Sequence, residues 1–599
     1  MIMGKQENDK NNHNVMTRIN YLFAAFLAMF MLSAHTAWAD TAYVKVTNTE
    51  GSVSWVAIEG TVSGTSFEVY KNGFDSAINY QTKGSIDLGE IWSESGGNGT
   101  HYQVTKIGDC AFKYCYDLTG VTIPEGVTYI GYSAFMNCKL IPDITIPESV
   151  TTIKGEAFAS CYGLTSARLP KSVTSIDRNP FYDCINLESI VVDAENTRFN
   201  SANNCNAIIQ TSNNALITGC KNTVIPSTVT SIGTRAFYKL ADLMSVNIPD
   251  GVTSIGDEAF RHCTGLTEIT LPSHLTSVGT AAFGECSNIS SLTIPESMTR
   301  IGIWAFINCS KITSLVIPKS VNSIGFGAFA GCDHLESIVV DEANTRFNSA
   351  DGCNAIIQTS NNTLIAGCKN TVIPNTVTTI GEYAFKYCHT LTDITIPESV
   401  TKIESMAFQE CGLSSITIPK SVTKIESYAF SYCSELISII SLIEDVFETG
   451  VYCFDRSPNV TLYVPKGLVS TYQATKDWNR IKDIEEIIPI IPLTMACNSK
   501  GKVKINNKVE VTNDVRKVNA NDGADNTFIF TPNEGCQLEQ VSIDGLDVTL
   551  SVEDNKLTTR VHENSKMIVT FSKLNADVNG DGHVNINDVV TLVNIILGL

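Results

Sequence analysis

The chain is poor in basic residues and in long apolar segments, and each shortage excludes a class of function. Among 599 residues, 42 are Lys or Arg and 62 are Asp or Glu, so the formal net charge is −20. Nucleic acids and anionic membrane faces both require a Lys/Arg-rich surface, so neither is an expected partner. Beyond the N-terminus no apolar run reaches membrane-spanning length, and we expect no transmembrane segment in the mature chain.

The motifs of common enzyme active sites are also missing. The sequence contains no P-loop, no His-Glu-x-x-His zinc motif and no Gly-x-Ser-x-Gly nucleophile elbow. Only nine histidines are present, and several of them fall at variable places in a repeated pattern described below. The sequence therefore predicts that the protein is not an enzyme.

The N-terminus has the features of an export signal. Arg18 precedes an apolar run, residues 21–32, and residues 37–39 spell the small-residue cleavage site Ala-Trp-Ala. Cleavage there removes residues 1–39 as a signal peptide and leaves Asp40 as the first mature residue. An uncleaved anchor helix is the alternative, although the apolar run is short for a bilayer. We expect a secreted, extracellular protein or one associated with the cell surface.

A repeated unit fills the middle of the chain. An Ala-Phe pair, once replaced by Pro-Phe, recurs at a constant interval within each run, apart from one interval that is shorter by a single residue. A full unit runs from Cys263 to Glu285 and reads CTGLTEITLPSHLTSVGTAAFGE. The repeated phenylalanines are Phe112, Phe135, Phe158, Phe181, Phe237, Phe260, Phe283, Phe306, Phe329, Phe385, Phe408 and Phe430.

The chemistry of one unit predicts a coil with a short strand. Leu266, Ile269 and Leu271 direct alternate side chains inward, and Pro272 ends the strand because proline cannot donate to a ladder. Gly279 is expected to permit the tight turn of the return limb. One unit cannot bury its own apolar face, whereas stacked units can, so the stable form is a row of coils.

A longer duplication overlies the repeat. A segment beginning at Val191 recurs almost unchanged from Val339, 148 residues later. Within it, two apolar stretches flank a Thr-Ser-Asn-Asn sequence, which is typical of a β-hairpin with an Asn-rich turn. We expect two hairpin inserts, residues 191–222 and 339–370.

The unit C-x-x-L-x-x-I-x-I-P-x-S-V-T-x-I-G-x-x-A-F resembles the BspA-like, Treponema-type leucine-rich repeats. The resemblance covers residues 101–487, including a stretch from Tyr463 that is similar to the terminal cap of such arrays, with Trp478 and Ile481 as lids. It implies an α/β-type solenoid, a leucine-rich-repeat array with short parallel strands. It also implies adhesion to host matrix proteins, to other cells or to bacterial surface proteins, in a Bacteroidetes-type bacterium.

The flanking segments differ in composition from the array. Residues 40–100 are rich in β-forming residues with Gly/Ser turns, and they match no family that we can name. Residues 488–573 contain alternating stretches typical of short strands and resemble an InlB-type B-repeat. We expect a small β-sandwich-like module there.

Most of the 19 cysteines follow the repeat. Eleven lie three residues after a repeat phenylalanine, and at the twelfth repeat that position is Leu240. Exchange with leucine predicts a buried apolar slot, and parallel side chains make disulfides between coils unfavourable. Two further pairs differ because each brackets one hairpin and could form a cross-strand disulfide. These pairs are Cys205 with Cys220 and Cys353 with Cys368.

The C-terminus carries a calcium-loop pattern. Oxygen-bearing residues at positions 1, 3, 5, 7, 9 and 12 surround Gly582, and an apolar helix follows. Hard oxygen ligands suit one Ca²⁺ ion rather than zinc. The ligands are Asp577, Asn579, Asp581, His583 through its carbonyl, Asn585 and Asp588.

This calcium loop-helix, residues 574–599, resembles one repeat of a type I dockerin. The likeness implies docking on a cohesin-like module. A dockerin has two such repeats, whereas this segment shows one. A purely structural calcium loop is the alternative.

The outward positions of the short strands form the expected ligand-binding face. They are mostly Ser and Thr, with few charges and no aromatic rings, which argues against a carbohydrate platform on this face. Small β-formers also suit a crowded parallel sheet, so the composition alone does not prove binding. The residues are Thr122, Thr145, Arg168, Asn247, Thr270, Thr293, Thr395 and Thr417.

Two functions fit the sequence. The first is a secreted or cell-surface adhesion protein that binds through the solenoid. The alternative is a non-catalytic accessory subunit of an extracellular polysaccharide-degrading assembly, recruited through the dockerin-like tail.

Overall fold

The structure is a computed structural model that describes residues 40–70, 76–457, 460–487, 490–505, 509–521, 525–532, 536–543, 546–547, 556–560 and 566–573. Two compact units are present. One ends at Thr461 and also takes in Ala474–Lys482; the other comprises Leu462–Gln473 and the chain from Asp483. The expected signal peptide, residues 1–39, and the calcium loop-helix, residues 574–599, lie outside the described residues.

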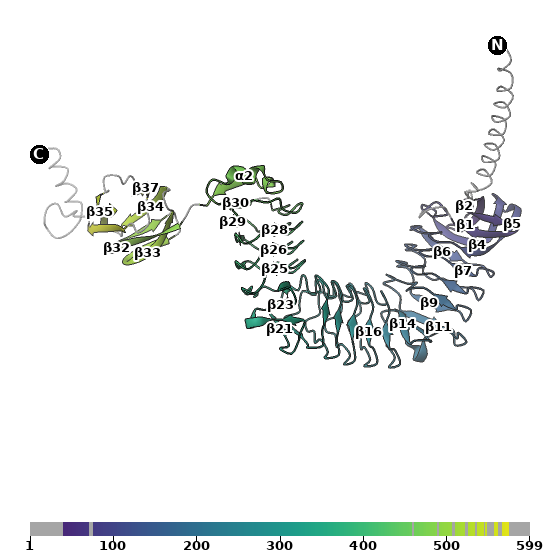
Figure 1. Ribbon diagram of the computed structural model, residues 1–599. Coiled ribbons are helices and arrows are strands. Elements are labelled where there is room, and N and C mark those ends of the chain that lie inside the picture. The colour runs from purple at the N-terminus through teal and green to yellow at the C-terminus, as the bar shows by residue number, and fades with distance from the viewer. Residues whose placement is uncertain are drawn as a thin grey trace, which may run out of the picture. The chain divides into compact units, whose positions relative to one another are not determined.

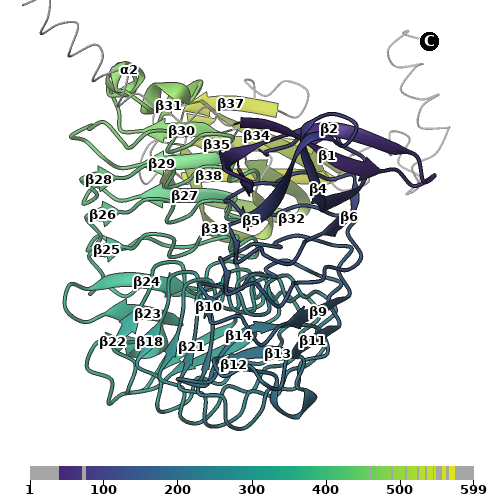
Figure 2. The same cartoon turned by 90° about the vertical axis from the view of Figure 1, so that its right-hand side faces the viewer.

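The first unit is a solenoid of stacked coils (Figures 1 and 2), and most coils add a two-residue strand to a parallel ladder. Register is kept from coil to coil, so Ser231 pairs with Ser254 and Ser254 with Ser277. The ladder strands are β7 (Tyr129–Ile130), β8 (Thr152–Ile153), β10 (Ser175–Ile176), β15 (Ser231–Ile232), β16 (Ser254–Ile255), β17 (Ser277–Val278), β18 (Arg300–Ile301), β20 (Ser323–Ile324), β25 (Thr379–Ile380), β26 (Lys402–Ile403) and β28 (Lys424–Ile425).

Each coil has two limbs, and the sequence predicts the strand in the first limb, before the proline. This first limb forms a hydrogen-bonded ladder in only some coils. In the unit from Cys263 this limb has no ladder strand, yet Leu266, Ile269 and Leu271 are buried as the alternation requires. The continuous ladder instead runs through the return limb, a difference that the apolar alternation alone could not reveal. Strands of the first limb are β6 (Leu118–Thr122), β9 (Ser166–Leu169), β11 (Ser189–Val192), β19 (Ser314–Ile317), β21 (Ser337–Val340), β27 (Ser415–Ile418) and β29 (Ser438–Ser441).

The α/β character expected of the solenoid is wrong for the array that the structure describes, which is a β-solenoid. In coils this short the return path is made of turns, and its backbone amides bond to the next coil rather than within a helix. The described helices are α2 (Val469–Ala474) and three 3-10 helices, η1 (Ala202–Asn204), η2 (Ala350–Gly352) and η3 (Trp478–Arg480).

The repeat phenylalanines stack into three inner ladders, one before the first insert, one between the inserts and one after the second. Phe260, Phe283 and Phe306 are fully buried, with adjacent ring centroids 5.2 and 5.4 Å apart and nearly parallel planes. A thirteenth ring, Phe454, extends the third ladder 5.6 Å beyond Phe430. The Ala-Phe pattern does not predict this coil, because Cys453 replaces the alanine of the pair.

Gly279 has a different role from the one expected. Its φ is not in the left-handed region, so no turn demands glycine there. A Cβ at Gly279 would lie 2.6 Å from the amide nitrogen and from Oδ1 of Asp257 in the preceding coil. The glycine therefore allows the two coils to approach closely.

The N-terminal residues cover the first coil. Their strands form a mixed sheet, antiparallel except for the parallel pair β3 and β5, and it continues into both limbs of the solenoid, since β4 pairs in parallel with β6 and β5 with β7. This capping role was not predicted from the sequence. The strands are β1 (Asp40–Thr47), β2 (Val53–Ser63), β3 (Ser66–Val69), β4 (Gly84–Glu94) and β5 (Asn98–Ile107).

At the other end of the first unit, Trp478 covers the phenylalanine ladder. Its ring lies 5.0 Å from that of Phe454, and its Nε1 donates to the carbonyl of Phe447 at 3.0 Å. Trp478 is fully buried and Ile481 nearly so, in agreement with the lid role expected for both.

Each duplicated insert forms the antiparallel hairpin that the sequence predicted. The second strand of each hairpin then starts a new ladder, because β14 pairs in parallel with β15 and β24 with β25. The inserts thus divide the array into three blocks. Their strands are β12 (Phe199–Asn200), β13 (Ala207–Gln210), β14 (Ala215–Gly219), β22 (Phe347–Asn348), β23 (Ala355–Gln358) and β24 (Thr363–Gly367).

The second unit holds α2, most of β30 (Thr461–Val464) and a seven-stranded mixed sheet. In the described residues all seven strands join one hydrogen-bonded sheet, so a sandwich of two sheets stays a prediction. Phe528, Phe530 and Val541 are buried. The remaining strands are β31 (Asp483–Glu486), β32 (Ile490–Ile505), β33 (Val509–Asn521), β34 (Asp525–Pro532), β35 (Cys536–Ile543), β36 (Leu546–Asp547), β37 (Lys556–Arg560) and β38 (Lys566–Lys573).

Candidate binding surfaces

The expected ligand face is an open row of outward side chains on the first limb. All eight predicted residues are exposed, and the coil stacking brings them into one row. Arg168 is the exception in chemistry because it forms ion pairs with Glu148 and Asp193. The other seven are uncharged, so this face offers hydrogen-bonding groups at the strand spacing of about 4.8 Å.

The same row contains valines that give it two apolar patches. Val191 and Val224 lie at the first insert, and Val316, Val339 and Val372 lie at the second, with exposures between 47% and 72%. The pairing of β19 with β21 sets Val316 directly beside Val339. The sequence analysis overlooked Val224 and Val372, although each precedes the same Ile-Pro dipeptide as the outward threonine of an ordinary coil.

A second surface, the turn edge, was not predicted. It consists of the two residues that bracket each Ala-Phe-x stretch, typically with positive φ, such as Tyr383 at 60° and Tyr387 at 61°. This conformation lets each amide donate to a carbonyl of the next coil, as Tyr387 does to Gln409 at 2.9 Å. The side chains therefore project from the coils in two parallel rows.

At the first insert, turn-edge side chains from the coils before and after the insert form a cluster of ion pairs, which we name the ionic clasp. Arg235 donates to Glu156 at 2.7 Å and to Glu258 at 2.8 Å, and it lies 4.7 Å above the ring of Tyr182. Tyr132 donates its hydroxyl to Glu156 at 2.8 Å. Burial and this bond to Glu156 raise the pKa of Tyr132. The clasp joins coils that the insert separates in the sequence.

At the second insert the equivalent clasp is aromatic. Trp304 and Tyr383, which correspond to Glu156 and Arg235 across the 148-residue duplication, have ring centroids 6.0 Å apart and perpendicular planes. Phe326 stacks on Tyr383 at 5.5 Å. Gly327 has φ +62°, and a Cβ there would lie 2.6 Å from Cδ1 of Trp304, so glycine makes room for the cluster.

The repeat cysteines form a ladder of thiol hydrogen bonds. Nine of the eleven repeat sulfurs donate to the carbonyl of the phenylalanine one coil earlier, for example Cys286 to Phe260 at 3.0 Å and Cys309 to Phe283 at 3.1 Å. The predicted slot is therefore buried, but it is not purely apolar. Burial raises the pKa of the Cys286 thiol to about 12, which removes the reactive thiolate at ordinary pH.

The thiol ladder predicts a labelling pattern. At pH 8, iodoacetamide is expected to leave Cys263, Cys286 and Cys309 unmodified in the native protein and to modify them in denaturant, as measured by peptide mass spectrometry. The reason is that raised pKa values and burial withhold both the thiolate and access. Val224→Cys is the control: position 224 is 72% exposed, so this cysteine should be modified in the native protein as fast as in denaturant. Rapid native labelling of the ladder would contradict the arrangement.

The two predicted hairpin disulfides are wrong in this structure. Cys205, Cys220, Cys353 and Cys368 are all free thiols. The hairpin register pairs Ala207 with Gly219, which sets Cys220 opposite Asn206 rather than opposite Cys205. Cys220 accordingly donates to the carbonyls of Glu188 and Asn206 at 3.2 and 3.4 Å. Its partner cysteine is one residue out of register.

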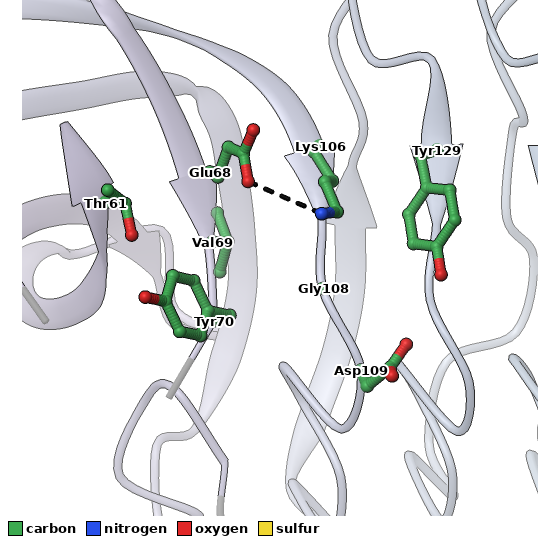
Figure 3. A pocket seen from close by; sticks show the side chains of 8 residues that line it. All are labelled: Thr61, Glu68, Val69, Tyr70, Lys106, Gly108, Asp109 and Tyr129. Atoms are coloured by element: carbon green, nitrogen blue, oxygen red, sulfur yellow. Dashed lines mark ion pairs between the residues drawn. The ribbon is translucent and has the colours of Figure 1, made fainter. Parts of the chain in front are cut away.

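A pocket of about 330 Å³ lies where the N-terminal sheet meets the first coil (Figure 3). Lys106 crosses it, 3.5 Å from Glu68 and 5.1 Å from the ring centroid of Tyr129. Figure 3 shows Asp109 and Tyr70 on its other sides. The ammonium group of Lys106 already has partners in Glu68 of the N-terminal sheet and Tyr129 of the array. These contacts hold the N-terminal cap against the array.

The described residues contain no cluster of three or more His, Cys, Asp or Glu side chains that could hold a metal ion. The six predicted calcium ligands, Asp577 to Asp588, lie outside those residues. In the same described part of the chain, no helix is long and apolar enough to cross a membrane.

These features define a class of protein. A row of coils with a closed interior, capped at both ends and open along its faces, is a repeat scaffold that offers extended surfaces for binding. The chain belongs to the BspA type leucine rich repeat family, whose profile matches six copies within residues 100–210, 230–351 and 364–475. The two stretches between these ranges fall in the hairpin inserts and the start of the coils that follow.

Similar solved structures include leucine-rich-repeat proteins of two bacteria. A leucine rich cell surface protein of Faecalibacterium prausnitzii is 22% identical, covering 72% of this chain and 93% of its own, with a TM-score of 0.40. A leucine-rich repeat protein of Bacteroides ovatus is 19% identical, covering 75% and 98%, with a TM-score of 0.33. No curated protein matches the chain.

Proposed function

We propose that the protein is a non-catalytic, secreted or cell-surface binding protein that recognises host matrix proteins or other cells through its solenoid. The observation that carries the proposal is the outward row of the first limb, which is exposed along the array and almost free of charge. Its uncharged polar groups and its two valine patches suit contact with a protein, because charged residues are depleted at the centres of protein interfaces.

The extracellular location follows from the proposed signal peptide, residues 1–39. The resemblance to BspA-like repeats, which implies adhesion to matrix or cells, agrees with this location. The proposed calcium loop, with one Ca²⁺ held by Asp577, Asn579, Asp581, His583, Asn585 and Asp588, would order the C-terminal helix, since such loops fold around their ion.

A second function rests on that loop. If it docks on a cohesin-like module, the protein is an accessory subunit of a polysaccharide-degrading assembly. The two functions differ in their dependence on calcium, because removal of the ion would disconnect a docked subunit and leave solenoid binding unchanged.

The test is a pull-down with immobilised residues 40–599, with calcium and with chelator, against host matrix extract and against proteins secreted by the source bacterium. We expect capture of matrix proteins in both conditions, and a loss of capture in Thr270→Arg/Thr293→Arg, which sets two cations in the outward row. Asp577→Ala/Asp581→Ala is the matched variant that should leave this capture intact. A bacterial partner captured only with calcium, and lost in the Asp577→Ala/Asp581→Ala variant, would instead identify a docked subunit.

A further inference from the structure

The last block of the array carries a set of tyrosines on its turn edge, which we name the tyrosine edge. It consists of Tyr383, Tyr428 and Tyr452 in one row and Tyr387 and Tyr432 in the other, on the coils that contribute β25 and β28 and the coil that follows β28 (Figure 1). All five have φ between 56° and 61°. Each row follows the array axis, so the rings succeed one another along the block.

Apart from Tyr383, whose ring belongs to the aromatic clasp with Trp304 and Phe326, the coil fold does not require rings at these positions. In other coils the same two positions hold Ala281, Ser160 and Gly331, with the same backbone path. A left-handed backbone disfavours bulky residues and favours Gly, Asn or Asp. The tyrosines therefore stand where smaller residues would satisfy the coil at lower cost.

The duplication gives an internal comparison. Tyr383 and Tyr387 correspond to Arg235 and Lys239 of the earlier copy, 148 residues before. Arg235 pairs with Glu156 and Glu258, and Lys239 pairs with Asp183 at 3.3 Å. The two copies keep almost the same hairpin and differ completely at these two positions. The turn edge, unlike the insert, has thus changed its chemistry between copies.

The rings lie at the surface with polar groups beside them. Tyr432 and Tyr452 are 41% and 40% exposed. Arg456 lies 5.3 Å from the ring centroid of Tyr432, and Arg480 lies 4.7 Å from that of Tyr452. Glu410 stands between the two tyrosines of the second row, which are therefore two coils, about 10 Å, apart.

This alternation favours one class of ligand. The centre of a protein interface is depleted of carboxylates, whereas here the carboxylate of Glu410 stands beside Tyr432 within its row, with the guanidinium of Arg456 on the other side. One charge of each sign gives no attraction for a polyanion. A chain of sugar rings suits this surface better. The tyrosine rings can contact the apolar C–H faces of the sugars, and the tyrosine hydroxyls and charged groups between them can hydrogen-bond to the sugar hydroxyls. The spacing of two coils is comparable with the length of a disaccharide.

We propose that the tyrosine edge binds a neutral polysaccharide chain along the array axis. The inference rests on the proposed binding function and adds to it a second ligand class on a second surface. The outward row of the first limb lacks aromatic rings and remains the surface for protein partners.

The test is native affinity electrophoresis of residues 40–599 through gels that contain amylopectin, xylan, xyloglucan or galactomannan. We expect at least one of these polysaccharides to retard the protein. Tyr387→Ala/Tyr432→Ala should weaken that retardation about tenfold, because two ring contacts are lost. Circular dichroism of each variant verifies that the solenoid is folded.

Tyr114→Ala is the matched control. Tyr114 has the same left-handed conformation on the same row, at 66°, and is 42% exposed, but it belongs to the first coil of the array. Retardation should be unchanged in this variant. No retardation by any of the four polysaccharides, or equal losses in the two variants, would overturn the inference while leaving matrix capture as a separate result. Loss of matrix capture in Tyr387→Ala/Tyr432→Ala, without any retardation, would also overturn it and assign the edge to a protein.

Discussion

Replacing Phe283 by alanine is expected to lower the free energy of unfolding of the array by about 3–5 kcal/mol. The ring is fully buried in the middle of the longest run of stacked phenylalanines, between Phe260 and Phe306. Its removal opens a cavity that the two neighbouring coils cannot fill, because their backbones are fixed by the ladder. Urea unfolding followed by circular dichroism measures the change.

Two further variants serve as controls for this prediction. Phe283→Leu keeps most of the volume and should cost less than half as much. Val224→Ala removes an apolar side chain that is 72% exposed and should change the stability by no more than about 0.5 kcal/mol. Equal losses at Phe283 and Val224 would mean that the phenylalanine ladder does not form the core.

The second large effect is expected at the ionic clasp. Arg235→Met should cost about 2–3 kcal/mol, toward the lower end for a broken buried pair because Arg235 is partly exposed. The loss arises because Glu156, whose side chain is only 9% exposed, keeps its charge without the guanidinium. In a repeat protein the loss of stability should be local to the interface between the first and second blocks. The cooperative unfolding of these two blocks should therefore be lost at a lower urea concentration.

A double variant separates charge from packing. Glu156→Leu/Arg235→Met removes both charges of the Glu156–Arg235 pair, while Glu258 still has its ion pair with Arg261, and the double variant should be more stable than Arg235→Met alone. Raising the salt concentration should matter less than either change, since a buried pair is weakly screened. A double variant that is less stable than Arg235→Met would show that the pair itself, rather than the unpaired carboxylate, governs the junction.

The interior of the array could be predicted from the sequence because its chemistry is periodic. Phenylalanines at a constant spacing, all but one followed by a cysteine at the same offset, can only align if the coils are stacked, and both ladders are present. The hairpins were predictable for a similar reason, since their strands and turn are adjacent in the chain. The outward row followed from the alternation of buried and exposed residues along one limb.

Other features depend on contacts that no local pattern encodes. Glu156 and Arg235 lie on opposite sides of the first insert in the sequence, and Trp304 and Tyr383 on opposite sides of the second. Only the path of each insert brings its pair together. The capping role of residues 40–107 depends on pairing between β4 and β6, which have different sequences. The hairpin cysteines failed as a disulfide prediction because bracketing a turn does not fix the register of the strands.

The thiol ladder has a consequence for how the chain matures. Seventeen described cysteines are buried and free, and each loses its reactivity only when its coil closes on the one before. In a chain that crosses into an oxidising compartment, coil closure would therefore compete with random disulfide formation. Each cysteine would be open to oxidation until its own coil has closed. Such a protein is safest where oxidants are scarce or where folding keeps pace with translocation. The same sulfurs that are inert in the finished solenoid would thus limit the environments in which it can be assembled.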